Sequence, residues 1–135
     1  MKCENVVERK ETILPINIDI LNQLGYQNLQ NAIDEYSHIL NKNCKKCSSD
    51  LNINIKYGNV ILIETTDGID QKIKLYDFQN SLILNQEQYE LVGIINFKRG
   101  ATITSVGHYT AFVKTNEWMQ FDDLYKCYSP FGYNE

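Results

Sequence analysis

Apolar residues recur at two spacings along this chain, and each spacing predicts a different element. From residue 29 to residue 40 they stand three or four positions apart, which predicts a helix with one apolar face, and Asn28 is placed to cap its start. From residue 51 to residue 57 they alternate with polar residues, which predicts a strand with one face in a core. The apolar run over residues 60–63 predicts a second strand, and Gly58-Asn59 between the two is typical of a hairpin turn.

Weaker signals predict further elements on both sides of these. Residues 12–18 predict a short strand, and Asp19 is placed to cap a short helical turn that Gly25 ends. Further strands are expected over residues 72–75, 82–84, 89–96, 109–114 and 118–121. This order, a little helix followed by an antiparallel meander, predicts an α+β fold.

Composition and charge narrow the class of protein. With 135 residues, 43% of them hydrophobic and 22% charged, the chain fits a single globular domain over residues 1–135. Its 17 acidic and 13 basic residues give a net charge of −4, so no nucleic-acid partner is expected. No apolar run reaches membrane-spanning length, and the first ten residues lack the apolar segment of a secretory signal. We therefore expect no membrane partner and a cytoplasmic or nuclear location.

The final pair of expected strands carries a candidate catalytic pair. His108 stands at the start of one strand and Asp122 just past the end of the other, so a turn at Thr115-Asn116 would bring an imidazole beside a carboxylate. Such a carboxylate fixes the ring tautomer and stabilises the imidazolium, as the third member of a catalytic triad does. For an arbitrary histidine and aspartate, a surface pair on a hairpin is the more common outcome. If the pair is catalytic, the ring nitrogen and carboxylate oxygen should lie about 2.6 to 3.2 Å apart.

The residues around this pair resemble the histidine box of the ubiquitin-specific proteases, a family of papain-like deubiquitinating enzymes. Gly107-His108-Tyr109, small and apolar strand residues, Trp118, and Phe121 followed by Asp122-Asp123 stand in the order of that box. Other segments resemble the family at compatible order and spacing, so the resemblance spans nearly the whole chain; these are residues 14–18, 29–33 and 89–95 and the pair Cys44 and Cys47.

The resemblance implies a fold and a set of roles. The fold would be a fragment of a papain-like cysteine protease, the C-terminal half of the catalytic domain, with mainly antiparallel sheet from the palm and fingers regions and one or two N-terminal helices. His108 would be the general base, Asp122 the residue that orients it, and Asp123 a second carboxylate that supports hydrogen bonding nearby. Gly107 would leave room for the ubiquitin tail and Tyr109 would contact substrate. Without the resemblance, the simpler interpretation is that this glycine forms a turn and this tyrosine faces the core.

The nucleophile that the family uses is not found in these 135 residues. In the family it lies well before the histidine, in a glycine- and asparagine-containing box at the start of a buried helix, where its thiol pKa is lowered. Cys3 precedes His108 but lies beside Glu4, with no helix start in view. Cys127 follows the histidine and so has the wrong order for the family.

Cys44 and Cys47 have the spacing of half a structural zinc site. In the family, two such pairs at the tip of the fingers subdomain complete a site of four cysteines, and Cys3 stands near where the first pair would end. The three cysteines are therefore candidate metal ligands, with a thiol pair that binds no metal as the alternative. No cofactor is expected to be required for catalysis.

Three functions follow from these interpretations. The preferred one is thiol-dependent hydrolysis of ubiquitin isopeptide bonds, with ubiquitin or a ubiquitinated protein as partner and with this chain incomplete or inactive alone. The alternative is a pseudoprotease module that binds ubiquitin without cleaving it. A small zinc-binding interaction module would leave the histidine box unexplained.

Overall fold

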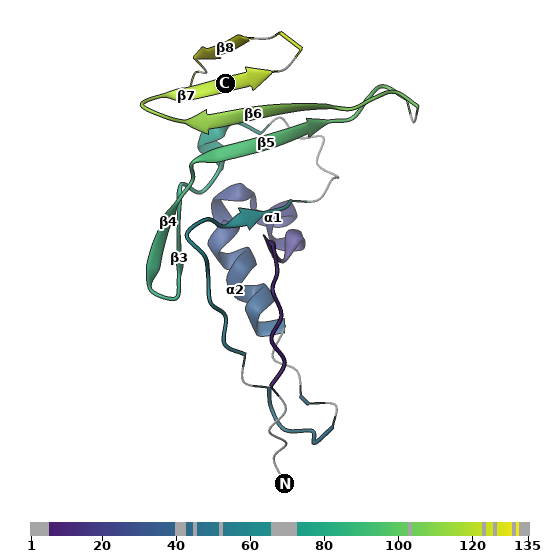
Figure 1. The fold of residues 1–135 in the computed structure, drawn as a ribbon, viewed down its shortest axis with the longest axis vertical. Coiled ribbons are helices and arrows are strands. Elements are labelled where there is room, and N and C mark those ends of the chain that lie inside the picture. The colour runs from purple at the N-terminus through teal and green to yellow at the C-terminus, as the bar shows by residue number, and fades with distance from the viewer. Residues whose placement is uncertain are drawn as a thin grey trace. The chain divides into compact units, whose positions relative to one another are not determined.

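The computed structural model describes residues 6–39, 43–44, 46–51, 53–65, 73–102, 104–122, 124–125, 127–130 and 132 (Figure 1). The chain divides into two compact units, the first made of Met1–Lys72 with Leu82–Tyr89 and the second of Ile73–Ser81 with Glu90–Glu135. After a two-residue strand the chain forms two helices, and mainly antiparallel sheets follow, which confirms the predicted α+β class. That one domain spans residues 1–135 stays a prediction. Among the described residues, no helix is both long and apolar enough to cross a membrane.

The first helix, α1 (Ile18–Leu24), is bounded by residues with non-helical backbone at both ends. Asn17 caps it, because its side-chain oxygen accepts a hydrogen bond from the Asp19 N–H at 3.2 Å. The prediction that Asp19 itself is the cap was therefore wrong by two positions. Gly25 ends the helix as predicted, with a φ of 84° that a residue with a Cβ rarely adopts.

A short 3-10 turn, η1 (Tyr26–Asn28), leads into the second helix, α2 (Leu29–Ile39), so the predicted helix is confirmed over the residues described. Leu40, its predicted last residue, lies outside them. The cap predicted at Asn28 is wrong: its side chain donates to the Leu24 carbonyl at 2.7 Å and accepts from the side chain of Asn31 at 3.3 Å.

The core of the first unit lies between α2 and two small sheets. The strands β1 (Ile13–Leu14) and β2 (Leu62–Ile63) pair in parallel, and β3 (Ser81–Leu84) and β4 (Glu87–Glu90) form a hairpin. Three buried side chains make the centre of this core, Ile33, Leu82 and Leu84. Partly buried residues from the other elements pack around them: Leu14, Ile16, Leu29, Tyr57, Ile61, Ile63 and Tyr89.

Four predictions for the middle of the chain were wrong. The described residues of segment 51–57 form no strand, and β2 pairs with β1, so Gly58-Asn59 does not close a hairpin. The strand expected over residues 72–75 is instead the start of a 3-10 turn, η2 (Leu75–Asp77), at its described end. The strand expected over residues 89–96 is divided into two separate strands by residues 91–92.

The second unit is built on a four-stranded antiparallel sheet in the order β5-β6-β7-β8. Its strands are β5 (Gly93–Lys98), β6 (His108–Lys114), β7 (Trp118–Asp122) and β8 (Cys127–Pro130). The predicted pairing of residues 109–113 with 118–121 is confirmed, through the bend at residues 115–117. The patterning did not predict β8.

The two faces of this sheet differ in burial. Because antiparallel partners share a face and neighbours alternate, His108, Asp122 and Trp118 belong to one face, which we call the dyad face. Trp118 is buried, and among the residues of this unit whose burial is described the only other buried side chain is Leu75. The other face, which we call the apolar face, carries Ile95, Phe97, Tyr109, Ala111, Val113, Met119, Phe121 and Pro130.

Candidate functional site

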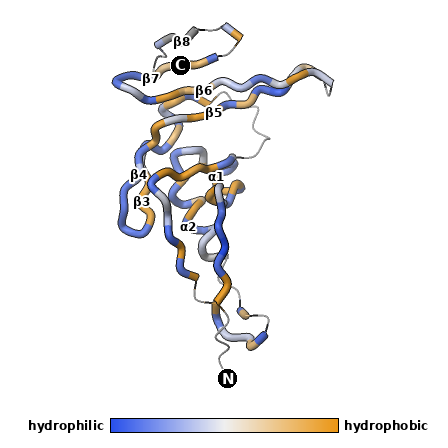
Figure 2. Tube along the Cα trace, in the orientation of Figure 1, coloured by the Kyte–Doolittle hydropathy of each residue, from blue (hydrophilic) through white to orange (hydrophobic). Residues whose placement is uncertain are grey.

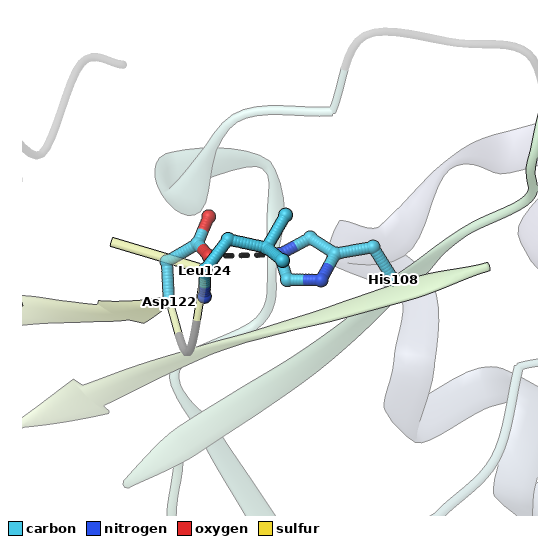
Figure 3. A network of polar contacts seen from close by, with 3 residues as sticks. All are labelled: His108, Asp122 and Leu124. Atoms are coloured by element: carbon cyan, nitrogen blue, oxygen red, sulfur yellow. Dashed lines mark hydrogen bonds and ion pairs between the residues drawn. The ribbon is translucent and has the colours of Figure 1, made fainter. Parts of the chain in front are cut away.

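The central contact of the candidate site joins the start of β6 to the end of β7. The Nε2 atom of His108 lies 2.8 Å from the Oδ1 atom of Asp122 (Figure 3). Thr110 is the Cα partner of Asp122, and His108 lies two residues earlier on the same face, so the two side chains meet diagonally across the strands. The distance expected from the hairpin arrangement is confirmed.

The backbone that follows β7 also forms hydrogen bonds with Asp122. The Leu124 N–H donates to the same Oδ1 atom at 3.0 Å (Figure 3). The Tyr125 N–H donates to the Asp122 carbonyl at 3.2 Å. A short turn therefore positions the carboxylate that the imidazole contacts. Analysis of the sequence missed Leu124, although an aspartate at the first position of a turn is a known signal for such a bond.

The pair is shielded on the dyad face. The side chains of His108 and Asp122 are 25% and 13% exposed, so their contact is less open to water and salt than a surface ion pair. With Nε2 directed at the carboxylate, the neutral ring carries its proton on Nε2. Nδ1, the nitrogen that Asp122 does not contact, is then the atom that can accept a proton, which is the requirement for a general base.

Gly107 and Tyr109, the expected substrate contacts, are associated with Phe97 and the apolar face. The ring of Tyr109 lies 4.6 Å from that of Phe97, centroid to centroid, and Tyr109 is 62% exposed. A Cβ on Gly107 would run into the Phe97 ring, so a larger residue here would have to displace that ring. The side chains of His108 and Tyr109 belong to opposite faces of the sheet. The structure therefore does not bring Gly107 and Tyr109 into one cluster with the catalytic pair.

Cys44 and Cys47, the expected zinc ligands, lie on one tight turn. The Cys44 N–H donates to the Ser49 carbonyl at 2.7 Å, and the Ser48 N–H donates to the Cys44 carbonyl at 2.8 Å. Ser48 has a φ of 54°, which lets the chain turn back sharply after the second cysteine. Two thiols on such a turn suit half of a tetrahedral site. The described residues contain no group of three or more potential ligands, and Cys3 lies outside them.

Cys127 lies next to the pair in the sheet but on the wrong side of Asp122. It is the Cα partner of Asp122 from β8, so β7 separates it from the strand of His108. Two strand spacings put the backbones of β6 and β8 about 9.5 Å apart. A backbone separation of this size does not favour direct proton transfer between Cys127 and His108. Asp123, the second expected carboxylate, lies outside the described residues.

Comparison with protein families matches residues 1–127 to the model described as ubiquitin carboxyl-terminal hydrolase. Since the chain has 135 residues, the match covers more than nine-tenths of it and includes both His108 and Asp122. Comparisons with curated proteins and with solved structures gave no match.

Proposed function

This chain belongs to the ubiquitin carboxyl-terminal hydrolase family, and from that premise we propose that His108 and Asp122 serve thiol-dependent hydrolysis of ubiquitin isopeptide bonds. The observation that carries the proposal is the 2.8 Å contact between the His108 Nε2 and Asp122 Oδ1 atoms on the shielded face of the sheet. An imidazole held in one tautomer by a carboxylate is the base that cysteine proteases and serine proteases share. We place this activity in the cytoplasm or nucleus, with ubiquitin or a ubiquitinated protein as partner.

We assign each atom of the pair a step. His108 Nδ1 takes the proton from a cysteine thiol, and the thiolate attacks the carbonyl carbon of the isopeptide bond. Asp122 stabilises the imidazolium while the tetrahedral intermediate exists. The imidazolium then gives its proton to the leaving lysine amine as the carbon–nitrogen bond breaks. A thioester remains, and His108 accepts a proton from the water that hydrolyses it, which returns the thiol and the ubiquitin carboxylate.

The thiol in this scheme comes from a polypeptide segment other than these 135 residues. Cys127 lies two strands from His108, Cys44 and Cys47 have the spacing of metal ligands, and Cys3 lies beside Glu4 with no helix start in the sequence around it. We further propose that Asp123 supports the same hydrogen-bond network. Gly107 and Tyr109 would then contact the ubiquitin tail at the entrance to β6.

The ubiquitin-binding part of this proposal can be tested with the chain alone. Titration of the chain into isotope-labelled ubiquitin should shift the signals of the ubiquitin C-terminal residues, because the substrate bond lies there. Ubiquitin that lacks its C-terminal tail is the control and should show a much weaker response. If no signal shifts at about 300 µM chain, any binding is weaker than a useful substrate site requires, and ubiquitin would be removed from the account.

The second candidate function is a pseudoprotease module that binds ubiquitin without cleaving it. The observation that favours it is the position of Cys127 beyond β7, which leaves the described part of the site with no cysteine on β6 or β7. Both functions predict binding of the ubiquitin tail. They differ in whether a separately supplied thiol segment restores hydrolysis, and restoration would exclude the pseudoprotease.

We also propose that Cys44 and Cys47 hold a structural zinc ion together with Cys3 or a ligand from another molecule. Two thiolates alone leave an open and weak site, so the remaining ligands must come from beyond the described residues. Protein purified without chelator should contain close to one equivalent of zinc, and Cys44→Ser should lower that content sharply. Cys127→Ser is the matched control and should leave it unchanged. Less than about a tenth of an equivalent in the unaltered chain would exclude the site, because structural zinc sites are normally filled.

A further inference from the structure

His108 lies at the end of β6 that is far from the tight bend of the hairpin. The bend at residues 115–117 and the buried Trp118 belong to the other end of this strand, about 20 Å away along six residues of extended chain. At its own end, β6 is joined to β5 by the connection over residues 99–107, which is longer than the bend. Figure 2 shows hydrophobic colouring in β5, β6 and β7, but among their side chains whose burial is described only Trp118 is buried. A strand end with so little burial frays readily unless a local contact holds it.

One aromatic ring contacts the residues on both sides of His108. Phe97 is the Cα partner of Tyr109, and the centroids of the two rings lie 4.6 Å apart with their planes tilted by 39°. The edge of the Phe97 ring lies where a Cβ on Gly107 would be, so the ring packs directly on this glycine. Gly107 precedes His108 and Tyr109 follows it. The ring therefore spans the backbone of His108 from the apolar face, while the imidazole belongs to the dyad face.

A contact of this kind is strong enough to hold a strand end. Phe97 and Tyr109 stand directly opposite each other, and on an antiparallel sheet such aromatic pairs stabilise the strands that they join. Loss of an aromatic pair shifts an equilibrium by about two- to tenfold. Because Gly107 has no side chain, the ring also reaches the backbone there, and Phe97 is 40% exposed. For a strand end that is only marginally ordered, this shift decides how often His108 is in place.

We propose that Phe97 is a positioning residue for the reaction. Its ring holds Gly107 and Tyr109 from the apolar face and so keeps the Nε2 atom of His108 at its 2.8 Å contact with Asp122. Phe97 acts through the backbone and supplies no group to the chemistry. The inference rests on the proposed function, because it treats His108 as the general base. The ring pair leaves Tyr109 62% exposed, so the proposed contact of Tyr109 with the ubiquitin tail stays open.

The ring nitrogens of His108 test this role in the chain alone, without ubiquitin or a thiol. All proteins carry His38→Gln, so that His108 is the one histidine present, and circular dichroism first shows that each is folded. Nitrogen-15 spectra in alkaline buffer should show a proton on Nε2 when Phe97 is present and a mixture of both tautomers in Phe97→Ala. Ile95→Ala is the matched control, because Ile95 lies on the same strand and face and is 74% exposed; it should leave the His108 signals unchanged. A side chain that served stability alone would lower the unfolding midpoint without changing the tautomer of the folded protein.

A second variant tests whether the ring acts through Gly107. Gly107→Ala places a Cβ where the Phe97 ring lies and should displace this ring, so it should give the same mixed spectrum as Phe97→Ala. The double variant should be no worse than Phe97→Ala alone, because the ring that the new Cβ would displace is already gone. Effects that add in the double variant would show that the two positions act independently and would contradict the proposal.

A third measurement uses the unaltered protein and so does not depend on whether a variant folds. The Lys114 N–H donates to the Val92 carbonyl at 2.9 Å, so every second N–H back along β6, including that of His108, faces β5. If the Phe97 ring holds this end, the His108 amide should exchange with solvent within about tenfold of the rate of Phe112, in the middle of the strand. Faster exchange at His108 would show that the end frays in spite of the ring, and the proposal would be wrong.

The outcomes separate this proposal from the proposed function. A proton on Nε2 both with Phe97 and in Phe97→Ala, or an equal change in Ile95→Ala, overturns the positioning role and leaves the general base in place. A proton on Nδ1 in the unaltered chain overturns both, because Asp122 would then not hold His108 in the tautomer that a base requires.

Discussion

The isolated chain is expected to leave a fluorogenic amide of the ubiquitin C-terminus intact. A general base accelerates attack by a nucleophile, and nothing in the described site supplies one within reach of His108. Removing the catalytic nucleophile from a serine protease lowers the rate by about six orders of magnitude, and a loss of similar size is expected here. The chain should therefore be indistinguishable from buffer, whereas an intact cysteine protease of the same family should turn over in the same assay.

Variants of the same chain give the controls for this experiment. If release above the buffer rate appears and is lost in His108→Ala, the chain has a nucleophile and the account is wrong on this point. Cys3→Ser and Cys127→Ser would then identify it. Loss with Cys3→Ser would also remove Cys3 from the zinc proposal, because a zinc-bound thiolate is not available as a nucleophile.

Replacement of Trp118 by alanine is expected to cost about 3 to 5 kcal/mol in the free energy of unfolding. This side chain is 6% exposed. Trp118 is the first residue of β7 and pairs with Lys114, next to the turn of the hairpin that carries the catalytic pair. Because the described part of the second unit has so few buried side chains, a cavity at Trp118 should unfold the sheet and separate His108 from Asp122.

Urea unfolding followed by circular dichroism measures this loss; fluorescence is unsuitable, since Trp118 is the one tryptophan in the chain. Ile95→Ala is the control on the same sheet, and with 74% exposure it should cost less than about 1 kcal/mol. A similar loss for the two variants would show that the core of this unit has been placed on the wrong face.

The elements that could be predicted from the sequence depend on contacts between neighbours in the chain. The spacing in residues 29–40 predicts α2, because apolar residues at every third or fourth position form one face of a helix and no distant segment is needed to see this pattern. The hairpin of β6 and β7 is predictable for the same reason, since three residues separate its strands.

Segment 51–57 could not be assigned correctly because its partners lie about thirty positions further along. Its alternation is that of an extended chain, but the Ile55 carbonyl and the neighbouring Gly58 carbonyl accept from side chains rather than from a neighbouring strand. The side chain of Asn85 donates to the Ile55 carbonyl at 2.6 Å, and the hydroxyl of Tyr89 donates to the Gly58 carbonyl at 3.0 Å. Periodicity reports which face is apolar and carries no information about which group will bind the backbone.

The His108 and Asp122 pair of the candidate site could be predicted from the sequence, because both residues lie on one short hairpin. Histidine and aspartate are recognisable residue types, and the hairpin between them sets their separation. The Leu124 N–H that positions the carboxylate is a backbone group, which every residue except proline has, so leucine itself gives no signal and only the aspartate at the start of the turn could have indicated this bond. The strand β8 could not be predicted for a different reason: its four residues, which include Pro130, are too few to show a period.

The central claim is that Asp122 holds His108 in the tautomer whose Nδ1 atom can act as a base. Nitrogen-15 correlation spectra of the imidazole rings, recorded in alkaline buffer where the rings are neutral, test it directly, and His38→Gln identifies which signals belong to His108. The account predicts a protonated Nε2 and an unprotonated Nδ1 in the unaltered chain, and a mixture of both tautomers in Asp122→Ala. A proton on Nδ1 in the unaltered chain, or identical spectra for the two proteins, would contradict it.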